Sequence, residues 1–405
     1  MSLARLALAY LAARPLLTAL NILLLALGVA TLAMLLLFTD QAEDRLTRDA
    51  KPVDLVVGAK GSPMQLILSS VFHADVPTGN IKLHDAEELL KNPMIASGTP
   101  LALGDSHAGF RIVGTDGSYL AMYGARVGAG RLFKDEMEAV VGAEVARKTG
   151  LVVGKPFVGT HGLSQGGSVH GGRPFTVVGI LERSGSVLDR LILTPVASVW
   201  HVHEEHGAAA GAAPAATAHG NEEDEREITA LLIRYATPLA AASLPRAINS
   251  GGGMQAASPA YESARLMNMV GLGVDTLQAF ALALMVSAAL SMFIALTSAL
   301  QERRYDLALL RALGARRSSL AALVLAEGVT LLASGVILGL ALGHAGAQWL
   351  GRWLEQSSQL PLTGYTWAPA ETWLVIAVSV AGIATCLLPA FQAYRSDIAT
   401  TLARR

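Results

Sequence analysis

Four histidines lie close together in one stretch of the chain, beside a run of acidic residues. They are His201, His203, His206 and His219, with Glu204 and Glu205 between them and Glu222–Glu225 and Glu227 after them. Neutral imidazole suits zinc, copper or nickel, and carboxylates can complete the coordination shell. On a strand, His201 and His203 would share one face, and His203 and His206 would meet on one helical turn. The spacing is not a strict zinc signature, so two hypotheses stay open: a metal site that takes zinc as its cofactor, with His161 and His170 as further candidate ligands, and a solvated acidic arm.

The chain offers little for nucleotide chemistry. Its nearest approach to a phosphate-binding loop is Gly150–Pro156 (GLVVGKP). This segment has one residue too few between its glycines for a P-loop, and it has Pro where Ser or Thr would bind magnesium. The single cysteine, Cys386, cannot form an intramolecular disulfide or a Cys-rich metal site. The sequence therefore predicts that the chain has no ATPase of its own and is not an enzyme.

The composition is that of a membrane protein. Hydrophobic residues make up 52% of the 405, charged residues only 16%, and the mean hydropathy is +0.44. The net charge of −1 gives no basic excess for binding nucleic acid. Four apolar runs, interrupted by a charge only at Glu327, are long enough to cross a bilayer as helices in contact with lipid. They are 15–39, 276–300, 318–350 and 372–394.

Arginines in the short flanks predict the orientation of these spans. Arg5 and Arg14 precede the first span, five arginines lie within 301–317, and Arg395 follows the last span together with Arg404 and Arg405. Because basic residues favour the cytoplasmic side, both termini and 301–317 are expected there. The N-terminal segment 1–14 is then a cytoplasmic amphipathic segment, and 395–405 is a cytoplasmic tail. The long segment 40–275 and the short loop 351–371 are expected outside.

The long extracytoplasmic segment has the mixed pattern of an α+β domain. The expected fold class is therefore an α-helical membrane domain of four transmembrane helices plus an α+β extracytoplasmic domain. Residues 41–49 and 262–273 are expected to continue the neighbouring spans as stalks, and a smaller subdomain is expected around 105–225. Expected helices are Met64–Phe72, His84–Lys91 with Asp85 as its N-cap, and Leu239–Ile248. Expected strands are Asp54–Gly58, Phe110–Val113, Ala139–Val141, Phe175–Leu181, Leu191–Leu193 and Thr229–Tyr235.

The cytoplasmic segment 301–315 has the pattern of a short amphipathic helix. Leucines recur at helical spacing, arginines lie about two turns apart on the polar side, and Gly314 is placed to end the helix. The leucines are Leu307, Leu309, Leu310 and Leu313, and the arginines are Arg304 and Arg311. Composition alone leaves two interpretations open, an anchor in the membrane interface and a helix that docks on a partner.

Two ionisable residues lie inside the apolar runs. Such groups are functional candidates because a charge inside a bilayer is costly. Glu327 lies near the cytoplasmic end of its run, so we favour pairing with Arg316 or Arg317 at the interface. For His344 we favour an interhelical hydrogen bond over a ligand role.

The stretch Glu302–Ala315 (ERRYDLALLRALGA) resembles the coupling helix of the FtsX/MacB-type ABC transporter permeases. Val140–Ala146, Gly150–Lys155 and Phe175–Leu181 resemble the periplasmic core domain of that family, and Leu387–Arg395 resembles its PA-x-x-A-x-R ending. The layout of one span, a large domain and three further spans also matches. The resemblance covers nearly the whole chain. The chain departs from the MacB subgroup, in which the ATPase is fused at the N-terminus.

The resemblance implies a permease that transmits ATP-driven motion to its periplasmic domain, in order to export or extract a substrate or to act on a periplasmic partner. It implies a separate cytoplasmic ATP-binding subunit in two copies that binds ATP and magnesium, a second permease copy, a periplasmic binding protein or lipoprotein as partner, and the bacterial inner membrane as location. Leucines would be buried against the ATPase, with charges at the rim. The residues expected at this contact are Glu302, Arg303, Arg304, Asp306, Leu309, Leu310, Arg311, Leu313 and Gly314.

Two other functions stay open. Segment Asp54–Ile81 resembles a subgroup of these permeases, and a link of that subgroup to zinc homeostasis is a hypothesis. With the His-rich loop, it makes zinc-linked export or delivery one alternative. The other alternative is a non-transport scaffold that activates a periplasmic enzyme. Within the segment, Lys60 and His73 are expected to have structural roles.

Overall fold

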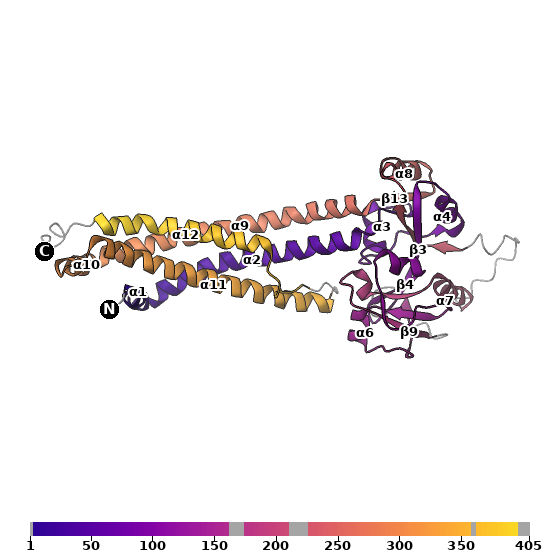
Figure 1. Cartoon of the computed structure of the whole chain (residues 1–405), viewed down its shortest axis with the longest axis horizontal. Coiled ribbons are helices and arrows are strands. Elements are labelled where there is room, and N and C mark those ends of the chain that lie inside the picture. The colour runs from indigo at the N-terminus through magenta and orange to yellow at the C-terminus, as the bar shows by residue number, and fades with distance from the viewer. Residues whose placement is uncertain (1–2, 162–173, 210–225, 358–361, 396–405) are drawn as a thin grey trace. The chain divides into compact units, whose positions relative to one another are not determined.

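The computed structural model describes residues 3–161, 174–209, 226–357 and 362–395. It divides into two units, Met1–Glu43 with Met269–Arg405 and Asp44–Asn268. The first unit is built from helices, and the second from strands and shorter helices (Figure 1). The expected fold class, a four-helix membrane domain plus an α+β domain, is confirmed.

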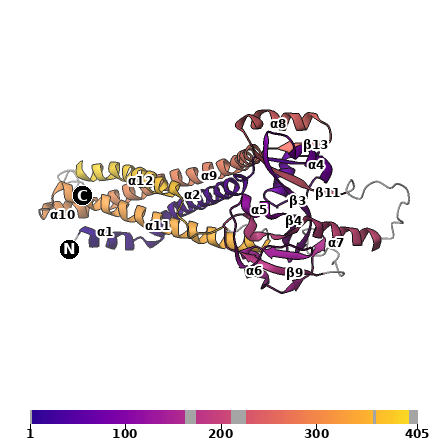
Figure 2. The same cartoon turned by 45° about the vertical axis from the view of Figure 1, so that its right-hand side comes forward.

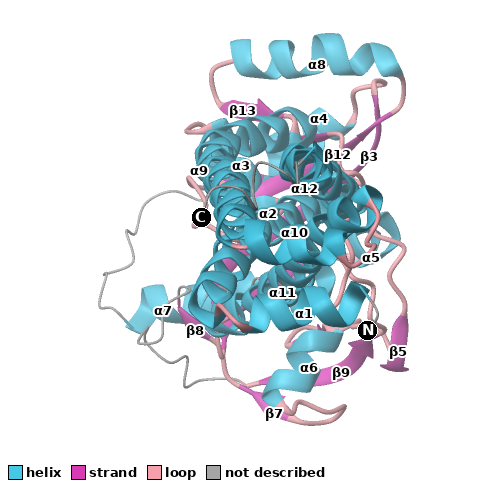
Figure 3. Ribbon diagram, turned by 90° about the vertical axis from the view of Figure 1, so that its left-hand side faces the viewer, coloured by secondary structure: helices cyan, strands magenta, loops and turns pink. Residues whose placement is uncertain are grey.

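Four long helices and two short ones make up the first unit in the described residues. The long helices are α2 (Pro15–Ala50), α9 (Pro259–Glu302), α11 (Arg317–Ser357) and α12 (Pro369–Arg395), and the short ones are α1 (Leu3–Ala12) and α10 (Arg304–Ala312). Each long helix has the length and composition to cross a membrane. The helical bounds of α2 and α9 include both expected stalks. Figure 3 looks along these helices from the end at which α1 and α10 lie.

Three glycines on α11 allow it to approach α2 closely. A Cβ atom would lie 2.6 Å from the Leu25 side chain at Gly335, 2.8 Å from the Ala26 carbonyl oxygen at Gly339, and 2.9 Å from the Ala30 carbonyl oxygen at Gly343. Their spacing of four residues places them on one face of α11. We call this contact the α2–α11 seam. Because lipid tails are as apolar as leucine, close packing of this kind is a main source of helix association in a bilayer.

A mixed sheet forms the centre of the second unit. In the described residues it has 11 strands, in the order β13-β1-β12-β3-β4-β10-β6-β9-β5, with β7 paired to β9 and β8 to β3. The β4–β10 and β6–β9 pairs are parallel, and the remaining pairs are antiparallel. The strands are β1 (Leu55–Ala59), β3 (Ile95–His107), β4 (Phe110–Thr115), β5 (Val127–Gly130), β6 (Glu138–Val141), β7 (Pro156–Phe157), β8 (Thr160–His161), β9 (Phe175–Leu181), β10 (Ile192–Pro195), β12 (Ala230–Tyr235) and β13 (Met254–Ala257). A separate pair joins β2 (Ile81–Lys82) to β11 (Glu227–Ile228).

Both faces of the sheet are buried, and side chains alternate between them. Val56 and Val140 contribute to one extended core, whereas their neighbours Val57 and Val141 belong to two separate cores. One of these lies under α4 (Leu83–Leu90) and α8 (Pro238–Ser250), and the other under α6 (Ala143–Thr149) and α7 (Val196–Ala209). The long strand β3 pairs with strands of both parts. Figure 2 shows these two parts of the second unit, one with α4 and α8 and the other with α6, α7 and β9. The part with α6, α7 and β9 agrees with the subdomain expected around 105–225.

Most expected elements are present with shifted ends. The three expected helices are α3 (Pro63–Ser70), α4 and α8, and the expected strands are β1, β4, β6, β9, β10 and β12. The choice of Asp85 as N-cap is wrong, because α4 begins at Leu83 and Lys82 is its N-cap. The helices α6 and α7 were not expected, nor were two shorter ones, α5 (Gly117–Met122) and the 3-10 helix η1 (Val187–Arg190). Side chains of Asp116 and Ser186 cap α5 and η1, which is a local signal that the short length of these two helices obscured.

Candidate functional site

The helix α10 is a separate element between two long helices. Arg303 is its N-cap, with φ −96 and ψ 12, directly after the end of α9 at Glu302. After Ala312 the chain passes through Gly314 at φ 101, a backbone angle that residues with a Cβ atom avoid. The N–H of Gly314 donates to the Arg311 carbonyl at 3.0 Å. The expectation that Gly314 ends this helix is confirmed.

The apolar residues of α10 and its C-cap fall into two groups, one buried within the chain and one exposed. Leu307 is buried and packs in a cluster with Ala7 of α1 and with Leu320 and Leu323 of α11. Leu309 is 47% exposed and Leu313 is 78% exposed. The leucine spacing predicted one apolar face, but the structure uses part of it within the chain and leaves part of it open. The side chains of Arg304, Asp306 and Leu310 lie outside the described residues.

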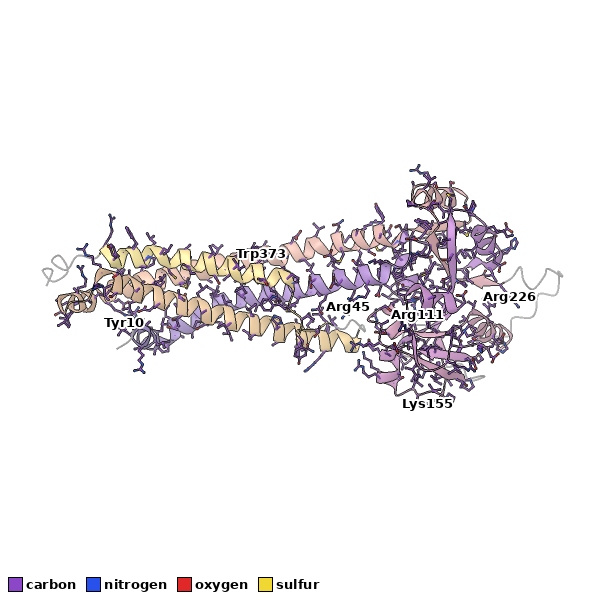
Figure 4. All side chains as sticks on the ribbon, in the orientation of Figure 1. Tyr10, Arg45, Arg111, Lys155, Arg226 and Trp373 are labelled. Carbon is purple, nitrogen blue, oxygen red and sulfur yellow. The ribbon has the colours of Figure 1, made fainter. Side chains whose placement is uncertain are left out.

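Arg303 joins three helices through its guanidinium group. Its Nη1 donates to Oε1 of Glu327 on α11 at 3.0 Å. The same guanidinium lies over the ring of Tyr10 on α1, 3.8 Å from the centroid, and Nη2 donates to the Tyr10 carbonyl at 3.4 Å. The side chains of Arg303 and Glu327 are only 14% and 6% exposed. Figure 4 labels Tyr10 on α1, beside the end of the bundle that carries α10.

A second ion pair ties the same junction to the start of α2. Glu302, the last residue of α9, pairs with Arg14, which precedes Pro15. Adjacent residues at the start of α10 thus contact α1, the α1–α2 connection and α11. A displacement of α10 cannot occur without a change in at least one of these contacts. The junction is held by charged pairs and apolar packing among the described residues.

The partner of Glu327 corrects the expectation from the sequence. We favoured Arg316 or Arg317, but the cation bound to Glu327 is Arg303. Glu327 lies ten residues beyond Arg317 on the same helix, a rise of about 15 Å, so a cation from another helix meets it more directly. Arg303 was expected at the rim of an ATPase contact, and in the structure it faces helices of its own chain.

Tyr10 and Arg14 were not predicted as parts of this site. The available signal was the amphipathic character of 1–14 and the basic flank of the first span, and neither identifies a partner. Their contacts depend on the tertiary arrangement of α1 against α10 and α11.

The His-rich segment is described only in part. His201 lies in α7, with Nδ1 3.8 Å from Oε2 of Glu136. Of the two local geometries considered for this segment, a strand and a helical turn, the structure has the helix, since these positions lie in α7. His219 and His170, and the side chains of His161, His203 and His206, lie outside the described residues. Among the residues that are described, no group of three or more His, Cys, Asp or Glu side chains could hold a metal ion. The zinc site stays a prediction.

Of the two sequence candidates His73 and Lys60, His73 has structural contacts. His73 is buried, with Nε2 2.9 Å from the Tyr119 hydroxyl, and Arg111 donates to the Asp75 carbonyl nearby at 2.7 Å. Burial, together with the charge of Arg111, lowers the pKa of His73 well below its usual value, so the ring is neutral. Lys60 is exposed. Gly150–Pro156 connects α6 to the strand β7, whereas a phosphate-binding loop precedes a helix.

Comparisons with known proteins cover most of the chain. A family model for the MacB-like periplasmic core domain matches residues 18–248, and one for the FtsX-like permease C-terminal matches residues 279–397. No curated protein matches the chain. Among solved structures, the periplasmic region of MacB from Actinobacillus actinomycetemcomitans is 14% identical, covering 55% of this chain and 98% of that one, with a TM-score of 0.35. The extracellular domain of the noncanonic ABC-type transporter YknZ from Gram-positive bacteria is 13% identical, covering 50% and 98%, with a TM-score of 0.30.

Proposed function

We propose a mechanism from the premise that this chain belongs to the family of FtsX-like ABC transporter permeases with a MacB-like periplasmic core domain. In this mechanism, the chain carries ATP-driven motion from cytoplasmic ATP-binding subunits to its periplasmic domain. That motion exports or extracts a substrate, or acts on a periplasmic partner. Membership of the family makes the chain an inner-membrane protein with a periplasmic domain.

One observation carries this proposal. α10 is a short, sharply bounded helix, and Leu309 on it and Leu313 at its C-cap are exposed, with no helix among the described residues covering them. Of the two interpretations of this helix, an anchor in the membrane interface and docking on a partner, the proposal takes docking, in which a partner groove gains about 1.5–3 kcal/mol for each leucine that it buries. The occupant in this proposal is a separate ATP-binding subunit, with one subunit for each of two permease copies.

The ties of α10 to the rest of the unit supply the path for the motion. Arg303 binds Glu327 of α11, and Leu307 packs on α1 and α11. The α2–α11 seam then joins α11 to α2 along the bundle. Because packed helices move as rigid bodies, a push on α10 is passed to α11 and α2 instead of being absorbed locally. Both termini and α10 are on the cytoplasmic side in this proposal.

Copurification of the ATP-binding subunit with Leu309→Asp tests the proposal. The variant removes an apolar contact and places a carboxylate where a groove would bury it, so we expect a loss of about 2–4 kcal/mol of binding free energy, or about 30- to 1,000-fold in affinity. Leu239→Asp is the control, because Leu239 is also an exposed leucine and lies on α8 of the periplasmic domain. Normal copurification of Leu309→Asp would refute the docking role of α10.

A zinc-linked role is a second proposal, supported by the four histidines and the acidic residues between 201 and 227. Calorimetric titration of the full chain with zinc, beside a variant with His201, His203, His206 and His219 changed to Ala, is its test. Binding that the variant loses supports zinc-linked export or delivery. Equal heats of zinc binding from both proteins would indicate that this segment is a solvated arm and not a metal site. A scaffold that activates a periplasmic enzyme would instead be recognised by a hydrolase that copurifies with the chain.

A further inference from the structure

The two long helices that extend into the second unit continue into the same edge of its sheet. After α2 ends at Ala50, residues 51–54 lead to β1, and Ser258 alone separates β13 from α9. β1 and β13 pair with each other at one end of the strand order. The strands β4, β10, β6, β9 and β5 lie at the other end, and neither long helix continues into any of them. We call these five strands, together with α6 and α7, the far part of the sheet.

A movement of α2 can reach the far part by two routes. One route runs through the strand pairs, and it crosses from β3 to β4, whose pairing is interrupted between Leu103 and Ser106. The other route is direct contact between α2 and the far part. The contacts at the end of α2 show that this second route exists.

The last turn of α2 binds the turn that connects β9 to β10. The N–H of Val187 donates to Oδ1 of Asp49 at 2.8 Å. Beside it, Nη1 of Arg48 donates to the Gly185 carbonyl at 3.0 Å. Asp49 is 6% exposed and Val187 is 1% exposed, so water does not replace the bond between them. Figure 4 labels Arg45, which lies four residues before Asp49 on α2.

The turn 184–190 is itself fixed to the far part. The carboxylate of Asp189 accepts from two backbone N–H groups of the turn, both at 2.8 Å. The backbone of the turn lies against Gly142, which joins β6 to α6, and a Cβ atom there would be 2.3 Å from the Leu188 carbonyl oxygen. The Gly142 N–H also donates to the Leu191 carbonyl at 2.9 Å. A displacement of the turn is therefore passed to β6 and α6 and is not absorbed by a loose loop.

The main chain of Asp49 is held as well. Its carbonyl oxygen accepts from the Tyr123 hydroxyl at 2.9 Å. The last four carbonyls of a helix lack partners within the helix, and this hydroxyl satisfies one of them. Tyr123 is the C-cap of α5, and its ring meets that of Tyr119 edge-on with centroids 5.4 Å apart. Asp49 thus binds elements outside its own helix through both its side chain and its backbone.

We propose that Asp49 is a positioning residue that makes the far part of the sheet move with α2. The inference rests on the proposed function, because it names the contact through which motion of α2 reaches this part of the second unit. Leu46 of α2 also packs against the extended core, but apolar contacts are non-directional and permit sliding. A hydrogen bond needs a set distance and angle, so the Asp49 contact fixes the position of the turn relative to α2.

Hydrogen exchange of the full chain in lipid nanodiscs tests the contact. Asp49→Ala leaves the buried Val187 N–H without its acceptor, which should favour opening of the turn by about 5- to 100-fold. Exchange in 184–190 should accelerate by that factor, whereas β1 and β13 should exchange as in the wild type. Asp49→Asn is the matched variant, because its amide oxygen can still accept from Val187, and it should retain the protection. Wild-type exchange of the turn in Asp49→Ala, or an equal acceleration in β13, would overturn the proposal.

Arg48→Met provides a second variant in case Asp49→Ala does not fold. Arg48 is exposed, and so is Gly185, whose carbonyl accepts from it, so the change leaves no buried group unpaired. Loss of this bond should accelerate exchange in 184–190 by about 2- to 10-fold. Wild-type exchange of the turn in this variant would also count against the contact.

Energy transfer between two dyes on one chain tests the transmission of motion. One pair, Asp44→Cys with Val153→Cys, joins α2 to the far part, and the control pair, Asp44→Cys with Leu239→Cys, joins α2 to α8. These three positions are exposed, and Cys386, the only native cysteine, is buried. With the ATP-binding subunit bound, ATP should leave both transfer efficiencies unchanged in the wild type and change only the first in Asp49→Ala. An ATP-dependent change of the first pair in the wild type would overturn the inference.

The two measurements distinguish failure of the inference from failure of the proposed function. Hydrogen exchange needs neither ATP nor the ATP-binding subunit. Wild-type protection in Asp49→Ala would therefore overturn the role of Asp49 and leave the ATP-driven motion of α2 untouched. Faster exchange in Asp49→Ala, without any response of the first dye pair to ATP, would instead refute the ATP-driven motion itself.

Discussion

The Arg303–Glu327 ion pair offers the sharpest test of how α10 is held. At 3.0 Å and an effective dielectric constant of about 20, the attraction between the two charges is about 5–6 kcal/mol. Removing two ions from water costs several kcal/mol each, so the net contribution of the intact pair is small. Removing one partner is different, because the other charge stays buried without compensation. That change typically costs about 3–5 kcal/mol.

The test is a double-mutant cycle. Arg303→Met should destabilise the full chain by about 3–5 kcal/mol and also remove the contact with the Tyr10 ring, worth about 0.5–2 kcal/mol. Glu327→Leu should cost a similar amount, since it leaves the guanidinium unpaired. The double variant replaces the pair with apolar groups and should be more stable than either single variant, which requires a coupling energy above about 3 kcal/mol.

Unfolding of the purified chain by sodium dodecyl sulfate measures these stabilities. Arg316→Met is the control, because Arg316 is exposed near the same loop and forms no ion pair with Glu327. It should change the stability by less than about 0.5 kcal/mol. Single variants that lower the stability independently, so that the double variant shows the sum of both losses, would refute the buried pair as the tie between α10 and α11.

Two further predictions concern the seam and the periplasmic domain. Gly339→Val should destabilise the membrane unit by about 1–3 kcal/mol in the same assay, because its Cβ would lie 2.8 Å from the Ala26 carbonyl oxygen. Gly346→Val is the control and should be nearly neutral, because the nearest atom to its Cβ would be Met34 Sδ at 3.6 Å. Equal losses of stability in the two variants would contradict the role of the seam. His73 should lower stability as the pH falls below about 6.5, since the unfolded chain takes up a proton that the buried ring, with its lowered pKa, does not. His73→Asn keeps a residue that tolerates the φ of 52 and should remove this acid sensitivity, seen as a flatter pH profile of the thermal midpoint; an unchanged profile would refute it.

The spans were the most predictable part of the fold. An uncharged apolar run of sufficient length has few alternatives to a membrane helix, and local composition is enough to identify it. The helical extensions of α2 and α9 were also visible as patterns that continue from the spans. Six strands of the second unit were found where runs such as Phe175–Leu181 are bounded by turns, but the long strand β3 was missed and the pairing was not predicted. Parallel pairing of β6 with β9 joins residues far apart in sequence, and no local pattern encodes it.

The candidate site was predicted as a helix and not as a set of contacts. The pattern in 301–315 gave the position and end of α10, but it could not separate the buried Leu307 from the exposed Leu313. Assignment of Glu327 to Arg316 or Arg317 failed because sequence proximity was used in place of spatial proximity. In the His-rich segment the ligand types were clear from the sequence, but a strand and a helical turn were both open, and only the structure shows the helix α7 there.

The sequence by itself determined the membrane class, the position of the large domain after the first span, and the family resemblance carried by Glu302–Ala315. These depend on composition and on residues that are close together in the chain. Only the tertiary structure decided that Arg303 joins Tyr10 and Glu327, and that Asp49 accepts from the Val187 N–H. In both cases the partners come from different helices, and burial changes the energy of a charge or a lone pair far more than any neighbour in sequence does. Such sites exist only once the helices have packed.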